Sequence, residues 1–122
     1  MQISMLRAKL HQARVTGADI HYVGSITIDK VLLEQAGMFP YEKVQVVDIE
    51  NGARFETYII AGAANSGVIE LNGAAARLAA IGDRLIIMAY SQVEFPPPVD
   101  WAPIVLVLDE NNAVKSIARQ GS

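Results

Sequence analysis

The chain has 122 residues, which is enough for one domain with a single hydrophobic core. Hydrophobic residues make up 52% and charged residues 19%, a balance that excludes an intrinsically disordered chain. Ten Lys and Arg against thirteen Asp and Glu give a net charge of −3, so no nucleic-acid partner is expected. The absence of cysteine excludes zinc–thiolate centres, disulfides and cysteine nucleophiles.

The apolar stretches are too short to cross a membrane as helices. The longest, residues 85–90 and 103–108, fall well below the roughly 18 residues that a spanning helix needs. Charges interrupt residues 1–15 every few positions, so we expect no signal peptide and a cytoplasmic location. The high fraction of hydrophobic residues instead favours contacts between subunits, which bury apolar surface.

Strand patterns dominate the chain in sequence order. Alternating apolar and polar residues, many of them β-branched, predict strands. These cover residues 5–16, 43–49, 55–61, 68–71, 84–91 and 104–108, and a last short strand follows the turn at 109–112. About seven strands in one small domain predict a mainly β fold closed into a barrel, because closure removes exposed strand edges.

Two short helices are expected between the strands. Asp29 can cap a helix over 30–36 that ends at Gly37, and Asn72 can cap a helix over 73–80. The prolines at 96–98 predict a stiff surface loop, because proline cannot donate a hydrogen bond to a strand ladder. The residues after Ala118 resemble a frayed end.

No metal site is predicted. His11 and His21 are the only histidines, and their spacing is not that of a metal-binding motif. Without cysteine, a site would need both imidazoles and scattered carboxylates.

The stretch Asn72-Gly73-Ala74-Ala75 has two interpretations. A cap residue followed by small side chains leaves main-chain N–H groups open, which suits binding of a carboxylate. The alternative is that an alanine-rich helix simply packs closely against a sheet.

A Gly24-Ser25 pair interrupts a strand-like run at residues 21–29. Such a pair is ordinarily a turn. The Ser25 hydroxyl is, however, the nearest nucleophile to the Gly24 carbonyl, and its attack would convert the peptide bond to an ester. The pair therefore fits either a turn or an intramolecular acyl shift.

Residues 54–58 carry a third candidate cluster. In a strand, Arg54, Glu56 and Tyr58 share one face, and Phe55 and Thr57 the other. A guanidinium and a phenol on one face would suit an acidic substrate. A surface pair of Arg54 with Glu56 is the alternative.

Taken together, these stretches resemble the aspartate 1-decarboxylase family of pyruvoyl enzymes. The matching pieces run in family order over roughly the first ninety residues, and the last third of the chain is similar only loosely. They are residues 5–6, 9–11, 18–19, 22–29, 51–54, 57–58, 66–69 and 72–76.

The resemblance implies a double-psi β-barrel with short helices, assembled as a homotetramer with active sites between subunits. It also implies self-cleavage between Gly24 and Ser25 of the single 1–122 domain, giving chains 1–24 and 25–122. Residue 25 then carries a pyruvoyl group that forms a Schiff base with L-aspartate, releasing CO₂ and β-alanine for pantothenate and coenzyme A synthesis. Whether an accessory protein activates the cleavage is open.

The resemblance also implies roles for individual residues. Thr57 would assist cleavage and contact substrate, and Tyr58 would donate the proton. Lys9 and Arg54 would bind carboxylates. The segment Asn72, Gly73, Ala74 and Ala75 would contact the substrate.

Some positions depart from the family pattern, and two other functions stay open. Gln12, Ile3 and Asn65 stand where basic residues are common. These differences bear on the expected affinity for substrate and not on the cleavage between Gly24 and Ser25. The alternatives are a double-psi homologue that never cleaves and a small β-barrel regulator without enzymatic activity.

Overall fold

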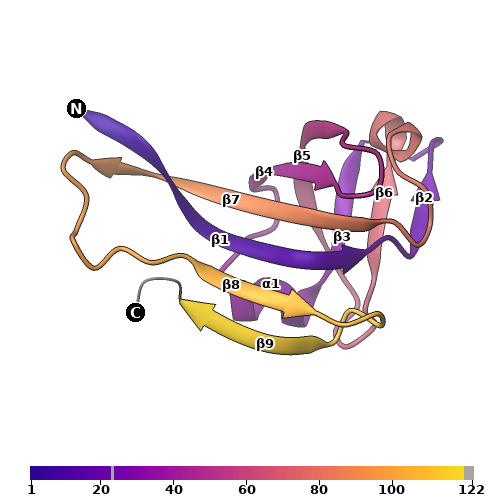
Figure 1. Ribbon diagram of the computed structural model, residues 1–122. Coiled ribbons are helices and arrows are strands. Elements are labelled where there is room, and N and C mark those ends of the chain that lie inside the picture. The colour runs from indigo at the N-terminus through magenta and orange to yellow at the C-terminus, as the bar shows by residue number, and fades with distance from the viewer. Residues whose placement is uncertain (23, 120–122) are drawn as a thin grey trace.

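The computed structural model describes residues 1–22 and 24–119; Val23 of the matched motif and residues 120–122 of the expected frayed end lie outside this description. The described chain is mainly β, as predicted (Figure 1). Its elements are β1 (Gln2–Arg14), β2 (Gly17–Asp19), β3 (Ser25–Asp29), α1 (Lys30–Ala36), β4 (Lys43–Asp48), β5 (Arg54–Gly62), β6 (Ile69–Asn72), the 3-10 helix η1 (Gly73–Arg77), β7 (Arg84–Glu94), β8 (Ile104–Leu108) and β9 (Val114–Arg119).

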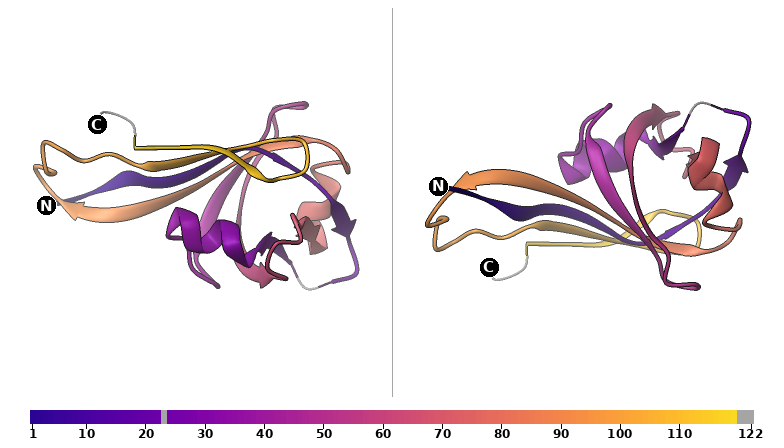
Figure 2. Two further views of the ribbon diagram at one scale, coloured as in Figure 1. Left: turned by 90° about the horizontal axis from the view of Figure 1, so that it is seen from below. Right: turned by 90° about the horizontal axis from the view of Figure 1, so that it is seen from above.

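The strands form one mixed sheet in the order β2-β6-β3-β5-β4-β7-β1-β8-β9. Three of its pairings, β3 with β5, β1 with β8 and β2 with β6, are parallel and join segments far apart in the sequence. The long β1 and β7 cross in front of β3, β5 and β6 (Figures 1 and 2). The segment after β1 reaches β6, where the Thr16 amide donates to the Ile69 carbonyl at 2.8 Å. This mixed, curved sheet is consistent with the expected double-psi β-barrel.

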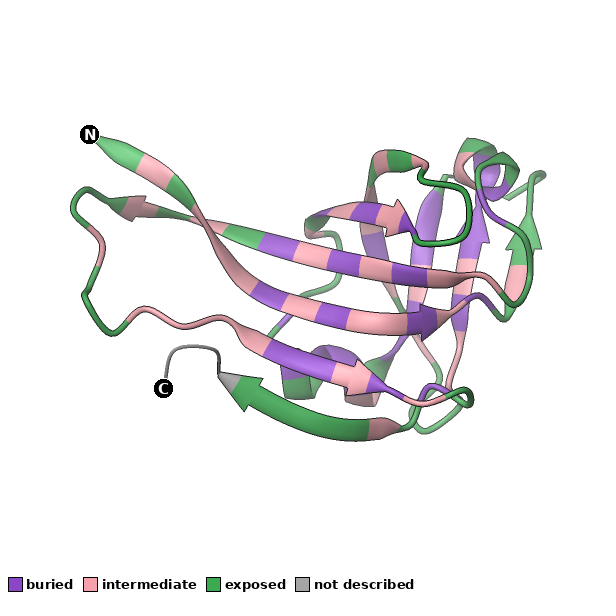
Figure 3. Ribbon diagram, in the orientation of Figure 1, coloured by how far each residue is buried: buried purple, intermediate pink, exposed green. Residues whose placement is uncertain are grey.

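Alternating burial along the strands separates an inner from an outer face (Figure 3). One cross-strand row of Leu10, Ile87, Val46 and Phe55 points into the core. Because side chains alternate along a strand, the residues on either side of each of these point outward. The outer face of this part of the sheet therefore carries the polar residues of β1, β4, β5 and β7.

The first predicted helix is confirmed, and the second is shorter than predicted. Asp29 caps α1 by accepting from the Val31 amide at 2.9 Å, and Gly37 ends the helix in the left-handed conformation with φ 71°. The predicted helix over 73–80 is only the 3-10 helix over 73–77, and Asn72 makes no side-chain cap. The Asn72 amide is instead used in hydrogen bonds to two hydroxyl groups.

One other expectation, the number of strands, differs from the structure. The described residues form nine strands rather than about seven, because the three-residue β2 and the run after Gly24 also pair. The 96–98 segment is a loop, as predicted. No helix in the described part of the chain has the length and apolar character needed to span a bilayer.

The end of β4 buries a carboxyl group. Asp48 is 0% exposed, and its Oδ1 accepts from the Glu50 amide at 2.8 Å. Its Oδ2 is also buried and has no donor among the described residues. Burial raises the pKa of Asp48, and the neighbouring Asp83 carboxyl raises it further. A proton on Oδ2 would remove the buried charge and let Asp48 donate to Asp83.

We predict that Asp48→Asn stabilises the protein at neutral pH. The raised pKa means that the folded state holds a proton that the unfolded state releases near pH 4, so wild-type stability falls as pH rises above that value. Asparagine is neutral throughout and keeps an acceptor for Glu50. The gain in unfolding free energy should reach about 1 kcal/mol at pH 7 and vanish toward pH 3.

Urea unfolding at several pH values measures this difference. Asp100→Asn, at an exposed position, is the matched control and should show no pH-dependent gain. An Asp48→Asn protein that is less stable than wild type at pH 7 would show that the carboxylate is ionised and favourable.

Candidate active site around Ser25

Ser25 is the first residue of β3 and lies opposite Asn72, the last residue of β6. Both are buried, at 0% and 1% exposure. The Asn72 Nδ2 donates to Ser25 Oγ at 2.9 Å and to Thr27 Oγ1 at 3.1 Å. One amide group therefore fixes the position of the candidate nucleophile.

Gly24 and Gly73 meet beside this pair. Gly73 begins η1 with φ 66°, a left-handed conformation that glycine adopts without strain. A Cβ built on Gly73 would lie 2.6 Å from Gly24 Cα. The predicted cleavage segment and the start of η1 are thus in direct main-chain contact.

Thr57 and Tyr58 lie on β5, the strand next to β3 on the other side. The two strands are parallel, with Ile26 beside Ile59. Continuing this register toward the N-terminus places Ser25 beside Tyr58 and Gly24 beside Thr57. Tyr58 also stacks on Tyr41, with ring centroids 6.4 Å apart.

The predicted alternation along β5 is confirmed. Phe55 packs on the core, whereas Arg54 and Glu56 are exposed. The ion pair of Glu56 is with Lys43 on β4, at 3.9 Å, and this contact is exposed. An exposed pair of this kind contributes little to stability.

Lys9 lies on β1, on the outer face of the sheet. Its cross-strand partners are Met88 on β7 and Val105 on β8. His11 is two residues further on and shares this face. Burial lowers the pKa of His11, and the Lys9 ammonium lowers it further. The Nδ1 atom of His11 is buried without a hydrogen-bond partner in the described chain.

The structure thus gathers some predicted site residues and separates others. It brings together Ser25, Gly24, Asn72 and Gly73, with the start of η1 carrying Ala74 and Ala75. Thr57 and Tyr58 lie on the adjacent strand. Lys9 lies apart from this group, because β5, β4 and β7 separate its strand, β1, from β3 in the sheet. Four strand spacings, or about 19 Å along the sheet, separate β1 from β3.

Two neighbouring residues were missed as part of the site. Thr27 shares the Asn72 amide with Ser25, and the period of two along β3 was a signal for this. His11 shares the outer face with Lys9, and its position two residues later was a similar signal. The two-residue spacing shows which side chains share a face of one strand, but it does not identify the residue that they contact on the neighbouring strand.

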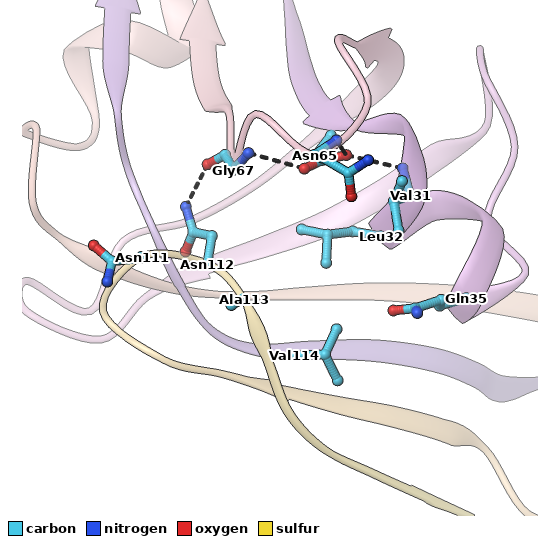
Figure 4. A pocket seen from close by; sticks show the side chains of 10 residues that line it. Val31, Leu32, Gln35, Asn65, Gly67, Asn111, Asn112, Ala113 and Val114 are labelled. Atoms are coloured by element: carbon cyan, nitrogen blue, oxygen red, sulfur yellow. Dashed lines mark hydrogen bonds between the residues drawn. The ribbon is translucent and has the colours of Figure 1, made fainter.

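A separate hollow of about 270 Å³, lined by both polar and apolar residues, lies between α1 and the turns at 65–67 and 111–113 (Figure 4). The Asp29 carboxylate accepts there from the main-chain amides of Val31, Asn65 and Gly67. The Asn112 side chain donates to the Gly67 carbonyl at 2.8 Å. These contacts tie α1 to two loops, and the hollow contains none of the predicted site residues.

The fold and site together define a small β-barrel protein built around a buried serine side chain. Comparison with known proteins is more specific. Residues 1–115 match the family model described as Aspartate decarboxylase. The chain belongs to the aspartate decarboxylase family.

Its similarity to curated relatives spans nearly the whole chain. The three described here carry the name Aspartate 1-decarboxylase. The protein from Clostridium novyi is 52% identical over 97% of this chain and 96% of its own. The protein from Chloroherpeton thalassium is 53% identical over 99% of this chain and 89% of its own. The protein from Lactiplantibacillus plantarum is 56% identical over 96% of this chain and 91% of its own. The similarity therefore continues past the ninety residues that the motifs covered.

We predict that Lys9→Gln raises the pKa of His11. The substitution removes the positive charge on the same face and leaves the imidazole's burial in place, so the pKa should rise while staying below its ordinary value. NMR titration of the imidazole resonances measures both histidines, and His21 serves as the internal reference. An unchanged His11 titration would show that Lys9 does not face the imidazole.

Proposed function

We propose that this protein decarboxylates L-aspartate to β-alanine and CO₂ with a pyruvoyl group made from its own Ser25. The observation that carries the proposal is the buried Ser25 hydroxyl, held by Asn72 immediately after the exposed Gly24. The names of the curated relatives support the substrate. The β-alanine would supply pantothenate and coenzyme A synthesis.

Maturation begins at the peptide bond between Gly24 and Ser25. Ser25 Oγ attacks the Gly24 carbonyl carbon; the new C–O bond replaces the C–N bond, and the hydroxyl proton passes to the freed amine. Loss of the Ser25 α-proton then expels Gly24 as a carboxylate and leaves dehydroalanine. Water replaces the nitrogen, which leaves as ammonia, and residue 25 becomes a pyruvoyl group.

The surroundings of Ser25 fit such a group. A pyruvoyl ketone supplies the electron sink that decarboxylation of an amino acid requires and that no ordinary side chain offers. Ser25 Oγ leaves with the Gly24 carboxylate, so the Asn72 Nδ2 that now donates to it would be available to donate to the ketone oxygen of residue 25. Burial of residue 25 shields the site from bulk solvent.

The neighbouring residues would divide the remaining tasks. The Thr57 hydroxyl, beside Gly24 by strand register, would stabilise the oxyanion during cleavage. Tyr58, beside Ser25 on the outer face, would protonate the product at Cα. Gly73, Ala74 and Ala75 lack side chains that could block a substrate from the main chain at η1.

Carboxylate binding by Lys9 beside Ser25 requires a second copy of the chain, whereas Arg54 lies on β5, the strand next to β3. The outer face of a barrel is convex, so residues about 19 Å apart on it point away from each other. Aspartate cannot bridge Lys9 and Ser25 within one chain. We therefore propose a homotetramer in which the outer face of β1 from one subunit supplies Lys9 to the Ser25 site of another.

Ser25→Ala should remain one inactive chain, because it lacks the attacking oxygen. Intact-mass spectrometry after incubation and release of CO₂ from L-aspartate measure the two properties. Ser116→Ala, on the exposed β9, is the control and should cleave and turn over normally. A Ser25→Ala protein that yields chains 1–24 and 25–122 would contradict the acyl shift.

Thr57→Val and Tyr58→Phe should separate cleavage from turnover. Thr57→Val keeps the side-chain shape and loses the oxyanion donor, so it should stall as a single chain. Tyr58→Phe keeps the ring and loses the proton donor. It should cleave normally and lose roughly 10²–10⁴-fold in CO₂ release. A Tyr58→Phe protein with wild-type turnover would remove Tyr58 from the mechanism.

Mixed assemblies test whether the site is shared. Lys9→Gln and Ser25→Ala should each be nearly inactive alone. Co-expressed in one cell, they should recover part of the activity, because a Ser25→Ala subunit still supplies Lys9 to a neighbour's Ser25. No recovery in mixed tetramers whose composition is verified by native mass spectrometry would place Lys9 and Ser25 of one subunit in the same site.

A further inference from the structure

Gly73 is in unusually close contact with the main chain before Ser25. A Cβ built at Gly73 would lie 2.6 Å from Gly24 Cα, 2.8 Å from Gly24 N and 3.0 Å from the Tyr22 carbonyl oxygen. Ordinary contacts of a Cβ begin near 3.4 Å. The atoms it would meet are main-chain atoms, which cannot rotate away as the end of a side chain can.

We infer that Gly73 is a positioning residue for self-cleavage, a role that rests on the proposed function. Its missing side chain allows the main chain at Tyr22 and Gly24 to pack on the start of η1. This contact holds the Gly24 carbonyl carbon within reach of Ser25 Oγ. The role differs from the substrate contact expected for η1, because it acts before any substrate binds.

The neighbouring residue Asn72 makes the arrangement effective. Asn72 holds Ser25 Oγ through its amide, while Gly73 contacts Gly24 through its main chain. Two consecutive residues thereby fix both partners of the acyl shift, the attacking oxygen and the carbonyl that it attacks. In that step the C–O bond forms, the C–N bond breaks and the proton moves to the Ser25 amine.

The size of the expected effect follows from geometry. A methyl group at Gly73 would push Gly24 by about 1 Å to reach ordinary contact, and a misplacement of that size can cost about 10²-fold in rate. Only Gly73 of this pair lacks room for a side chain, since a Cβ built on Gly24 itself meets nothing within 4 Å. The constraint therefore lies at Gly73.

Gly52 provides a matched control for backbone strain. Its φ is 76°, close to the 66° of Gly73, but a Cβ there meets nothing within 4 Å. Gly52→Ala and Gly73→Ala thus share the cost of a left-handed alanine. Only Gly73→Ala adds the collision with the segment before Ser25.

The experiment follows cleavage of wild type, Gly52→Ala and Gly73→Ala by intact mass over time, with thermal unfolding of each precursor. We expect Gly52→Ala to lose stability and cleave at the wild-type rate. Gly73→Ala should be folded and cleave about 10²-fold more slowly. Dilute hydroxylamine at neutral pH, which cuts an ester far faster than a peptide bond, should not speed cleavage between residues 24 and 25, because the block precedes ester formation.

Three results would overturn the inference. Equal cleavage rates for Gly73→Ala and Gly52→Ala would overturn it alone and leave the proposed function standing. Rapid cutting of Gly73→Ala by dilute hydroxylamine between residues 24 and 25 would do the same, since the acyl shift would then be intact. A wild-type protein that never cleaves would overturn the proposed function and the inference together.

A second measurement applies where Gly73→Ala does not fold. In the uncleaved Ser25→Ala protein, selective glycine labelling should reveal a nuclear Overhauser contact between the α-protons of Gly73 and Gly24. Observing it supports the packing directly. Its absence in the folded protein would contradict the inference without any change at residue 73.

Discussion

The register between β3 and β6 places Ser25 opposite Asn72, and the proposed chemistry depends on this pairing. Paired side chains of antiparallel strands lie on the same face, so the amide reaches the hydroxyl at 2.9 Å. A shift of one residue would turn Asn72 to the core and leave Ser25 without this donor. The core residues on either side, Ile26 and Leu71, oppose such a shift because both are fully buried.

In the proposed function, the same alternation explains why one chain would be an incomplete enzyme. The apolar side chains of β1, β4 and β5 point into the core, so the polar side chains that alternate with them point outward. Lys9 and Arg54 then lie on different strands of the outer face, and Ser25 is buried on a third strand. Convergence of a cation on the Ser25 site needs the surface of another copy, which agrees with the apolar surplus of the sequence. Assembly and catalysis are in this account two consequences of one folding pattern.

Much of the fold could be predicted from local patterns. The alternation in β4 and the Asp29 cap of α1 are properties of adjacent residues, and both predictions are confirmed. The helix over 73–80 was predicted too long because Asn72 bonds across the sheet instead of capping it. The three-residue β2 is too short for any periodic pattern, and only its pairing with β6 defines it.

The site residues were predicted from the family resemblance rather than from spacing. Ser25, Tyr58 and Asn72 come from three segments that no local pattern connects. The contact of Gly73 with Gly24 and the carboxyl pair of Asp48 with Asp83 could not be predicted. Each joins residues more than thirty positions apart, and their closeness follows from the strand order. Sequence patterns thus predicted the elements, and the topology supplied the contacts.

An intact-mass spectrum of the incubated wild-type protein tests the central claim most directly. The account predicts two chains, 1–24 and 25–122. The larger chain should be lighter than the product of simple hydrolysis by the mass of one ammonia molecule, because the Ser25 nitrogen is lost. A single chain of 122 residues, or a larger fragment that keeps its amino group, would contradict the account.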